Sequence, residues 1–320
     1  MNRRTFIWLP VTSIAIGSMT AVAQQKIWRI GFLRVGTPPK TFIDGFRQGL
    51  RELGLVEGRH FVIEFGLADS AAQISAVARE LVSRRVDILI ASGTPSVWPA
   101  RDAAGKTPVV FIATLDPVAT GLVGSLAKPG GNITGVTSIS GDLIAKRLQL
   151  VRELLPRATT VAILMRESSP TANQYIRESQ VAARVLGIEL KIFVERSPID
   201  FQKVFVSMRG LSALVVADDA EFTANRALIA QLALNDRLPF ICGLKEMVEA
   251  GGLLSYGASF GALYRQAASH TRKILLGVSP SDLPVEQPTN FEFVLNMRTA
   301  KALGLAIPPS ILVRADKLIE

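Results

Sequence analysis

The sequence is poor in the side chains on which most catalytic and metal sites depend. Its 320 residues include one cysteine and two histidines. Cys242 has no second cysteine for an intramolecular disulfide, and its apolar neighbours favour a buried, unreactive thiol. His60 and His270 lie far apart in the chain, so a histidine metal site or a Ser-His-Asp triad has little support. We therefore expect no metal and no other cofactor.

Two nucleotide-binding motifs are also missing. The chain contains no Gly-x-Gly-x-x-Gly dinucleotide fingerprint and no Gly-x-x-x-x-Gly-Lys-Ser/Thr phosphate loop. Nor does the sequence pair an obvious nucleophile with a base. These absences make a binding protein a better hypothesis than an enzyme.

The charge balance is basic but diffuse. The chain has 36 Lys and Arg against 27 Asp and Glu, a net charge of +9. The basic residues stand between apolar residues at helical spacing, which is typical of solvated helix faces. No helix-turn-helix, zinc finger or aromatic RNA-binding strand accompanies them. We therefore expect no nucleic-acid partner.

Residues 1–23 have the pattern of a secretory signal peptide. Arg3 and Arg4 precede an apolar run at 6–19 that is too short to span a bilayer comfortably. Ala21-Val22-Ala23 then forms a small-residue cleavage site, so we expect cleavage after Ala23 and a periplasmic location. The pattern leaves open whether the general or the twin-arginine pathway exports the chain.

After this segment, short β-rich runs alternate with amphipathic helical windows in two copies of one pattern. Strands alternating with helices indicate parallel sheets with right-handed crossovers, and therefore an α/β protein with two doubly wound lobes. The predicted strands are 29–33, 60–65, 87–91 and 109–113, then 160–165, 189–194, 213–217 and 239–242. The predicted helices are 41–53, 71–84 and 96–104, then 143–155, 172–186, 200–209 and 222–235, with later helices at 261–276 and 296–304.

The chain is expected to cross between the lobes about three times. The predicted hinge strands are 133–137, 253–257 and 284–293, a number of crossings that suits a clamshell closing at a hinge. The first lobe is then expected to comprise residues 24–137 plus 258–286. The second is expected to comprise 138–257 plus 287–320, with a ligand cleft between the two.

Polar loops follow the predicted strands, where ligands bind in open parallel sheets. Ser92, Gly93 and Thr94 open a helix whose free N–H groups suit an anion, although they equally suit a plain helix cap. Asp116 and Asp218 are candidates for a ligand ammonium or for helix caps. The full set of candidate ligand-binding residues is Val35, Thr37, Ser92, Gly93, Thr94, Thr114, Asp116, Asn173, Asp218, Glu246 and Tyr256, the last as a stacking or core residue.

Several longer stretches together carry a family resemblance. They are 29–33 (RIGFL), 46–54 (FRQGLRELG), 56–58 (VEG), 92–95 (SGTP), 116–118 (DPV), 126–135 (LAKPGGNITG), 249–257 (EAGGLLSYG), 283–289 (LPVEQPT) and 300–305 (AKALGL). On these residues the chain resembles the bacterial ABC transporter substrate-binding protein family that includes tryptophan- and tyrosine-type binding components. The resemblance implies a type I periplasmic-binding-protein fold and an ABC permease partner in the membrane.

One stretch departs from that family. Where the family reads Asn-Pro followed shortly by Asn, this chain has Arg166 and Glu167, and Asn173 stands at the place of the second Asn. The added charge lies where ligand choice is expected, so the solute is left open.

The resulting hypothesis is a monomeric capture protein without catalysis. A small solute, an amino acid or a similar molecule, bridges two lobes and is delivered to an importer. A periplasmic sensor that presents its solute to a membrane receptor needs the same clamshell and stays an alternative. A secreted enzyme is the less favoured third alternative.

Overall fold

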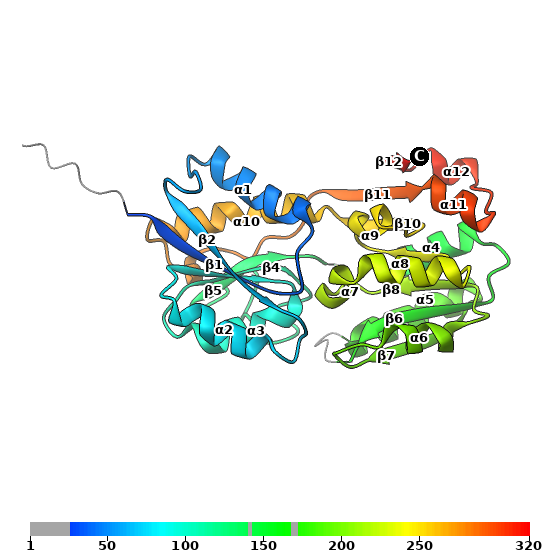
Figure 1. The fold of residues 1–320 in the computed structure, drawn as a ribbon, viewed down its shortest axis with the longest axis horizontal. Coiled ribbons are helices and arrows are strands. Elements are labelled where there is room, and N and C mark those ends of the chain that lie inside the picture. The colour runs from blue at the N-terminus through cyan, green and yellow to red at the C-terminus, as the bar shows by residue number, and fades with distance from the viewer. Residues whose placement is uncertain (1–25, 140–142, 168–171) are drawn as a thin grey trace, which may run out of the picture.

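Short and almost wholly buried strands form the centre of two α/β lobes (Figure 1). The computed structural model describes residues 26–139, 143–167 and 172–320. The predicted signal peptide therefore lies outside the described residues, as do residues 168–171 of the unusual loop. No helix in the described ranges is both long and apolar enough to cross a membrane.

The first lobe is built on a five-stranded parallel sheet of order β2-β1-β3-β4-β5. Its interior strands are continuous apolar runs, because helices cover both faces of the sheet. One face packs against α2 and α3, the other against α1 and α10. The elements are β1 (Trp28–Val35), α1 (Lys40–Glu52), β2 (Phe61–Ala68), α2 (Ile74–Ser83), β3 (Ile88–Ser92), α3 (Thr94–Ala104), β4 (Val109–Thr114), β5 (Ile133–Thr137) and α10 (Phe260–Leu275).

The second lobe contains a seven-stranded sheet of order β12-β11-β10-β9-β8-β6-β7. The strands are β6 (Thr160–Arg166), β7 (Glu189–Glu195), β8 (Ala213–Val216), β9 (Phe240–Cys242), β10 (Leu254–Ala258), β11 (Phe291–Asn296) and β12 (Lys317–Ile319). The helices are α4 (Ile144–Leu154), α5 (Ala172–Leu186), α6 (Phe201–Met208), α7 (Ala220–Ala224), α8 (Arg226–Asn235), α9 (Lys245–Glu249), α11 (Met297–Leu303) and α12 (Pro309–Leu312).

The duplicated pattern predicted from the sequence is confirmed by strand order. The run β2-β1-β3-β4-β5 in the first sheet corresponds to β7-β6-β8-β9-β10 in the second, with the first strand of each unit in second place. In each sheet the order reverses beside that first strand, between β1 and β3 and between β6 and β8. The carboxyl ends of strands at such a switch point are where open α/β sheets bind ligands.

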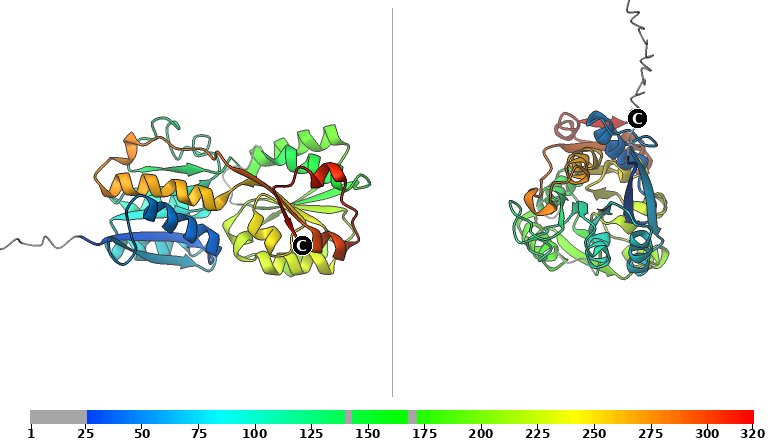
Figure 2. Two further views of the ribbon diagram at one scale, coloured as in Figure 1. Left: turned by 90° about the horizontal axis from the view of Figure 1, so that it is seen from above. Right: turned by 90° about the vertical axis from the view of Figure 1, so that its left-hand side faces the viewer.

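The late part of the chain returns to the first lobe through α10, which lies along α1 (Figure 2). Two glycines of α1 permit the contact: a Cβ on Gly45 would lie 2.3 Å from the Gly261 carbonyl oxygen, and one on Gly49 would lie 2.5 Å from that of Arg265. The chain then crosses back to the second sheet before β11, along the 3₁₀ turn Pro280–Asp282 and the stretch that follows it.

Two predictions about the second lobe are wrong in detail. The helix predicted at 222–235 is two helices, because the chain turns at Asn225, whose side chain donates to the Glu221 carbonyl (2.8 Å). The hinge strand predicted at 284–293 begins only at Phe291, beyond Pro284 and Pro288, which have no N–H to donate to a ladder. This strand, β11, pairs antiparallel with β10, so the second sheet is parallel only in part.

Candidate ligand-binding site

The carboxyl ends of the two sets of central strands face each other across the lobe boundary. A cavity of about 20 Å³ lies between them, enough for about one water molecule. The first lobe lines it with Arg34, Gly93, Thr94 and Ala113, and the second with Asp218, Asp219, Ala220, Thr223 and Leu244; Ser138 and Phe260 come from the crossings. The residues thus come from the loops beside both switch points.

Direct contacts hold the lobes together around this cavity. The Thr41 hydroxyl of α1 donates to Glu246 Oε1 of α9 (2.7 Å), and the Ala71 amide donates to Ser197 Oγ (3.2 Å). At Gly36, which follows β1, a Cβ would lie 2.3 Å from the Ala224 Cβ of α7. The lobes are therefore closed on each other in this structure.

Arg34 is the principal cation of the cavity. Its side chain is 2% exposed and lies at the end of β1, opposite Ser92 in the neighbouring strand. Nη1 donates to Ser92 Oγ (2.9 Å) and approaches the Tyr264 hydroxyl (3.5 Å), and the guanidinium lies 5.4 Å from the centroid of the Phe42 ring. Within the part of the chain that the structure describes, no carboxylate pairs with Arg34, and its buried Nε has no acceptor.

Further polar groups gather at the same end of the first sheet. The Thr114 and Ser138 hydroxyls are buried and lack a hydrogen-bond partner among the described residues. The Ser138 amide donates to the Thr114 carbonyl (3.1 Å), so the two residues are adjacent. The β4–β5 register shifts between Ile112 and Thr114, and Ala113 there has a φ of 58°, a strained value for a residue with a Cβ.

The acids of the cavity have partners in the second lobe. Asp218 accepts from Arg147 Nη2 (3.1 Å) and from the Gly243 amide (3.1 Å). Asp219 accepts from Arg166 Nε (2.8 Å) and caps α7 through the Glu221 amide (2.8 Å). Both ion pairs are buried.

The fully buried Arg147 stays charged because of its neighbours. Burial is the largest single influence and disfavours its guanidinium cation, but Asp218, Tyr175 and Cys242 together outweigh burial and raise the pKa of Arg147 above its ordinary value. For Glu246, by contrast, the shift disfavours the charged form. Burial raises the pKa of its carboxyl, and the hydrogen bond from Thr41 opposes this shift.

The other predicted site residues are placed differently from one another. Gly93 and Thr94 line the cavity; Gly93 has a φ of 80°, and no side chain caps the helix that follows. Val35 is buried, whereas Thr37 and Asn173 are exposed. Asp116 accepts from the Ala119 amide (2.9 Å), which is a local cap. Tyr256 packs edge-on against Phe293 in the second lobe, and its carbonyl accepts from Arg147 Nε (2.9 Å).

The candidate ligand-binding residues chosen from the sequence do not include Arg34, Ser138, Arg147, Arg166 or Asp219, although the charge of Arg166 was placed near the site. Arg34 had a usable signal, because it is a charged residue inside the apolar run of β1. Arg147 had none, since its partner Asp218 lies 71 residues away in the chain.

A larger hollow of about 410 Å³ opens at the rim of the same lobe boundary. It shares Thr94 with the inner cavity, and the second lobe contributes Arg166, Glu167 and Arg196 to it. Pro95 and Trp98 form an apolar part of its wall on the first lobe. The rim therefore combines an apolar wall with charged groups next to the inner cavity.

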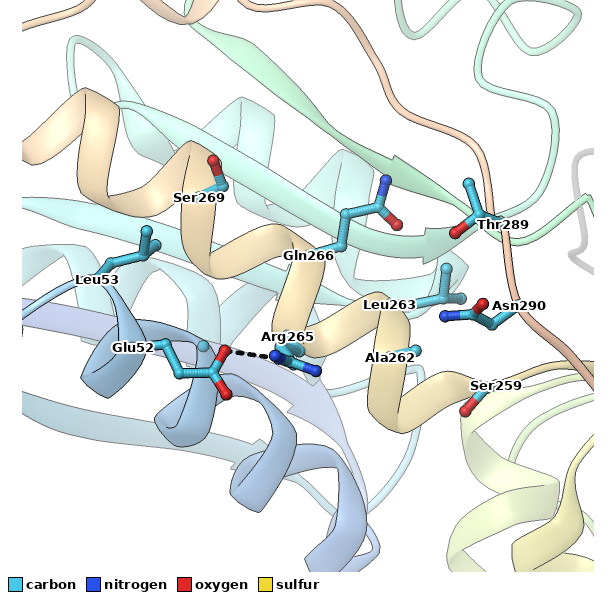
Figure 3. Close-up of a pocket in the computed structure, with 11 residues that line it drawn as sticks. Glu52, Leu53, Ser259, Ala262, Leu263, Arg265, Gln266, Ser269, Thr289 and Asn290 are labelled. Atoms are coloured by element: carbon cyan, nitrogen blue, oxygen red, sulfur yellow. Dashed lines mark hydrogen bonds and ion pairs between the residues drawn. The ribbon is translucent and has the colours of Figure 1, made fainter.

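A third hollow, of about 420 Å³, lies outside the cleft (Figure 3). It is lined by α1, α10 and residues 289–290. Its cation, Arg265, is exposed and donates to Glu52 (2.7 Å). This hollow offers no buried unmatched charge, in contrast to the inner cavity.

One stretch near this hollow matches a hydrolase pattern that the sequence analysis did not single out. Residues 257–261 (GASFG) fit Gly-x-Ser-x-Gly and join β10 to α10. Ser259 has an unstrained φ of −70°, and its hydroxyl donates to Glu292 Oε1 (2.6 Å). His270 instead bonds the Pro284 carbonyl through Nε2 (2.9 Å), so no Ser-His pair forms there. The described residues also contain no group of three His, Cys, Asp or Glu side chains suited to a metal ion.

Comparisons with known proteins agree with this architecture. A tyrosine-binding protein from Clostridioides difficile is 27% identical over 263 residues, covering 82% of this chain and 76% of that protein. The ABC domain from Streptococcus pneumonia in complex with L-Trp has a TM-score of 0.83 at 25% identity, covering 92% of this chain and all of the other. The ligand-free, open structure of a substrate binding protein from Clostridium difficile has a TM-score of 0.63, also at 25% identity, covering 92% of this chain and 99% of the other.

These folds are type I periplasmic-binding-protein folds of two α/β lobes. The family model described as "ABC transporter substrate binding protein" matches residues 39–319, which is most of the chain. The match includes every residue that lines the cavity except Arg34, at the end of β1. The chain belongs to the ABC transporter substrate-binding protein family.

Proposed function

We propose that the protein is the extracytoplasmic solute-binding component of an ABC importer, and that it closes on a small molecule between its lobes. The observation that carries the proposal is the inner cavity, enclosed by strand-end loops of both lobes beside both switch points. A solute bound between these loops would touch residues of both lobes and so stabilise the closed arrangement over the open one.

The comparison structures support a closing motion. At the same 25% identity and the same 92% coverage of this chain, the L-Trp complex superposes better than the ligand-free, open structure. The contacts of Thr41 with Glu246 and of Ala71 with Ser197 exist only while the lobes are together.

The proposal includes the cellular setting. The chain is exported by its signal peptide, is cleaved after Ala23 and acts in the periplasm as a monomer. Its moving bodies are residues 24–137 plus 258–286 and residues 138–257 plus 287–320. A membrane permease receives the solute, and amino acids are among the candidates because the relatives are described as binding tyrosine and L-Trp.

The test combines ligand identification with scattering. Solute released from natively purified protein by denaturation is identified by mass spectrometry. The same solute is then titrated into refolded, solute-free protein while the radius of gyration is measured by small-angle X-ray scattering. We expect the radius of gyration to fall on binding; a solute that binds without compaction would contradict the proposal.

A further inference from the structure

Among the described charged side chains that line the inner cavity, one is unmatched. The lining contains Arg34, Asp218 and Asp219. Each aspartate already pairs with a buried arginine, Arg147 or Arg166. The hydrogen bonds and the ring contact of Arg34 involve only hydroxyl and aromatic groups. The three lining charges and the two paired arginines therefore sum to one net positive charge.

From this charge balance we infer that the solute is a small carboxylate without a cationic group, and that its carboxylate pairs with Arg34. The inference rests on the proposed function, because it concerns the same cleft. A buried cation without a counter-charge is strongly disfavoured, and an anionic solute removes that penalty by supplying the missing carboxylate. The guanidinium is also the side chain best suited to bind a carboxylate through two N–H groups.

Neighbouring groups favour an oxyanion in the same place. The Thr114 and Ser138 hydroxyls are buried donors without described partners beside the cavity. Helix α3 begins at Thr94, and no side chain caps its first turn. Its positive N-terminal end therefore faces the cavity that Arg34 lines.

The same balance disfavours an ammonium group on the solute. Asp218 accepts from Arg147 and the Gly243 amide, and Asp219 accepts from Arg166 and the Glu221 amide. An ammonium would have to share a carboxylate whose charge an arginine already balances. A zwitterionic amino acid would also leave in place the net positive charge of this group of three arginines and two aspartates. The chain therefore differs in expected solute class from relatives described as binding tyrosine and L-Trp.

The test uses two sets of three probes that share a body and differ in charge. The first set is 3-(4-hydroxyphenyl)propionate, L-tyrosine and tyramine, and the second is indole-3-propionate, L-tryptophan and tryptamine. Isothermal titration on the refolded mature protein measures each affinity. In at least one set we expect the acid to bind roughly tenfold or more tightly than the amino acid, and the amine to bind least.

Variants tie the preference to Arg34. We expect Arg34→Gln to lose tenfold or more in affinity for the acid and to abolish the preference, whereas Arg34→Lys keeps the charge and the preference. Arg265→Gln, which changes an exposed arginine outside the cleft, should match the unaltered protein. The melting temperature of each variant without probe shows whether it is folded.

The outcomes separate the two proposals. An amino acid that binds as tightly as its deaminated acid, or unchanged acid binding in Arg34→Gln, overturns the inference but leaves the capture function standing. An acid that binds without compaction overturns the capture function instead. The inference is also overturned if none of the six probes binds and the native protein releases no solute, or releases one that is zwitterionic or cationic.

Discussion

The buried ion pair between Arg147 and Asp218 permits a quantitative prediction. Their side chains are 0% and 6% exposed, and Arg147 Nη2 lies 3.1 Å from Asp218 Oδ2. Two unit charges at this separation attract by about 5 kcal/mol at an effective dielectric constant of 20. Asp218→Asn keeps the size of the side chain but removes the charge, so Arg147 loses its counter-ion while remaining buried.

We expect Asp218→Asn to lower the free energy of unfolding by about 3–5 kcal/mol, as in other proteins where one partner of a buried pair is removed. For a lobe of this size, that corresponds to a fall of roughly 6–20 °C in Tm. Urea denaturation followed by circular dichroism, with Tm from calorimetry, measures the loss.

Two variants serve as controls. Glu249→Gln removes the carboxylate of an exposed pair with Lys317 and should cost less than about 1 kcal/mol. The double variant Arg147→Met and Asp218→Leu removes both charges, and should recover much of the stability lost in Asp218→Asn. A loss in Asp218→Asn no larger than in Glu249→Gln would refute the claim that Asp218 holds a buried charge in place.

Three further predictions follow from single contacts. Gly36→Ala should weaken carboxylate binding much more than Gly54→Ala, because both glycines have positive φ but only Gly36 faces the other lobe; titration calorimetry compares them. Burial raises the pKa of Glu246, so the stability that this residue contributes is greatest at acid pH and declines as the pH rises through its folded-state pKa. The urea midpoint measured against pH should show this decline, and Glu246→Gln should abolish the decline. Burial likewise raises the pKa of Cys242 to about 12, so the thiol should react with Ellman's reagent only after unfolding.

The fold was predictable because its signals are local. The run Ile88–Ser92 is buried along its whole length, and its apolar letters alone indicate a strand covered on both faces. The repeated alternation of strands and helices likewise predicts two similar sheets. Asn225 interrupts a helical pattern without a proline or glycine to mark the break, so the division into α7 and α8 was not visible in the sequence.

The site was only partly predictable, because its chemistry depends on pairing over long distances. The sequence places Asp218 at a strand end, and from there a ligand contact and a structural contact look alike. Only the fold brings Arg147 of α4 to its side and leaves Arg34 of β1 without a described carboxylate. The polar run at residues 92–94 follows a buried strand and precedes a helix, and two of its residues, Gly93 and Thr94, line the cavity.

The unmatched charge of Arg34 also bears on when the lobes close. Second-lobe residues line the cavity beside Arg34, and the two acids among them, Asp218 and Asp219, already pair with arginines. Closing an empty protein therefore removes water from the guanidinium without supplying a further carboxylate to balance it. A penalty of about 2.7 kcal/mol would shift an otherwise balanced equilibrium to about one closed molecule in a hundred. We therefore expect solute-free protein to be open and Arg34→Gln to be more compact without solute, as measured by its radius of gyration. An unchanged radius of gyration in Arg34→Gln, with the fold intact, would mean that Arg34 does not link occupancy to closure.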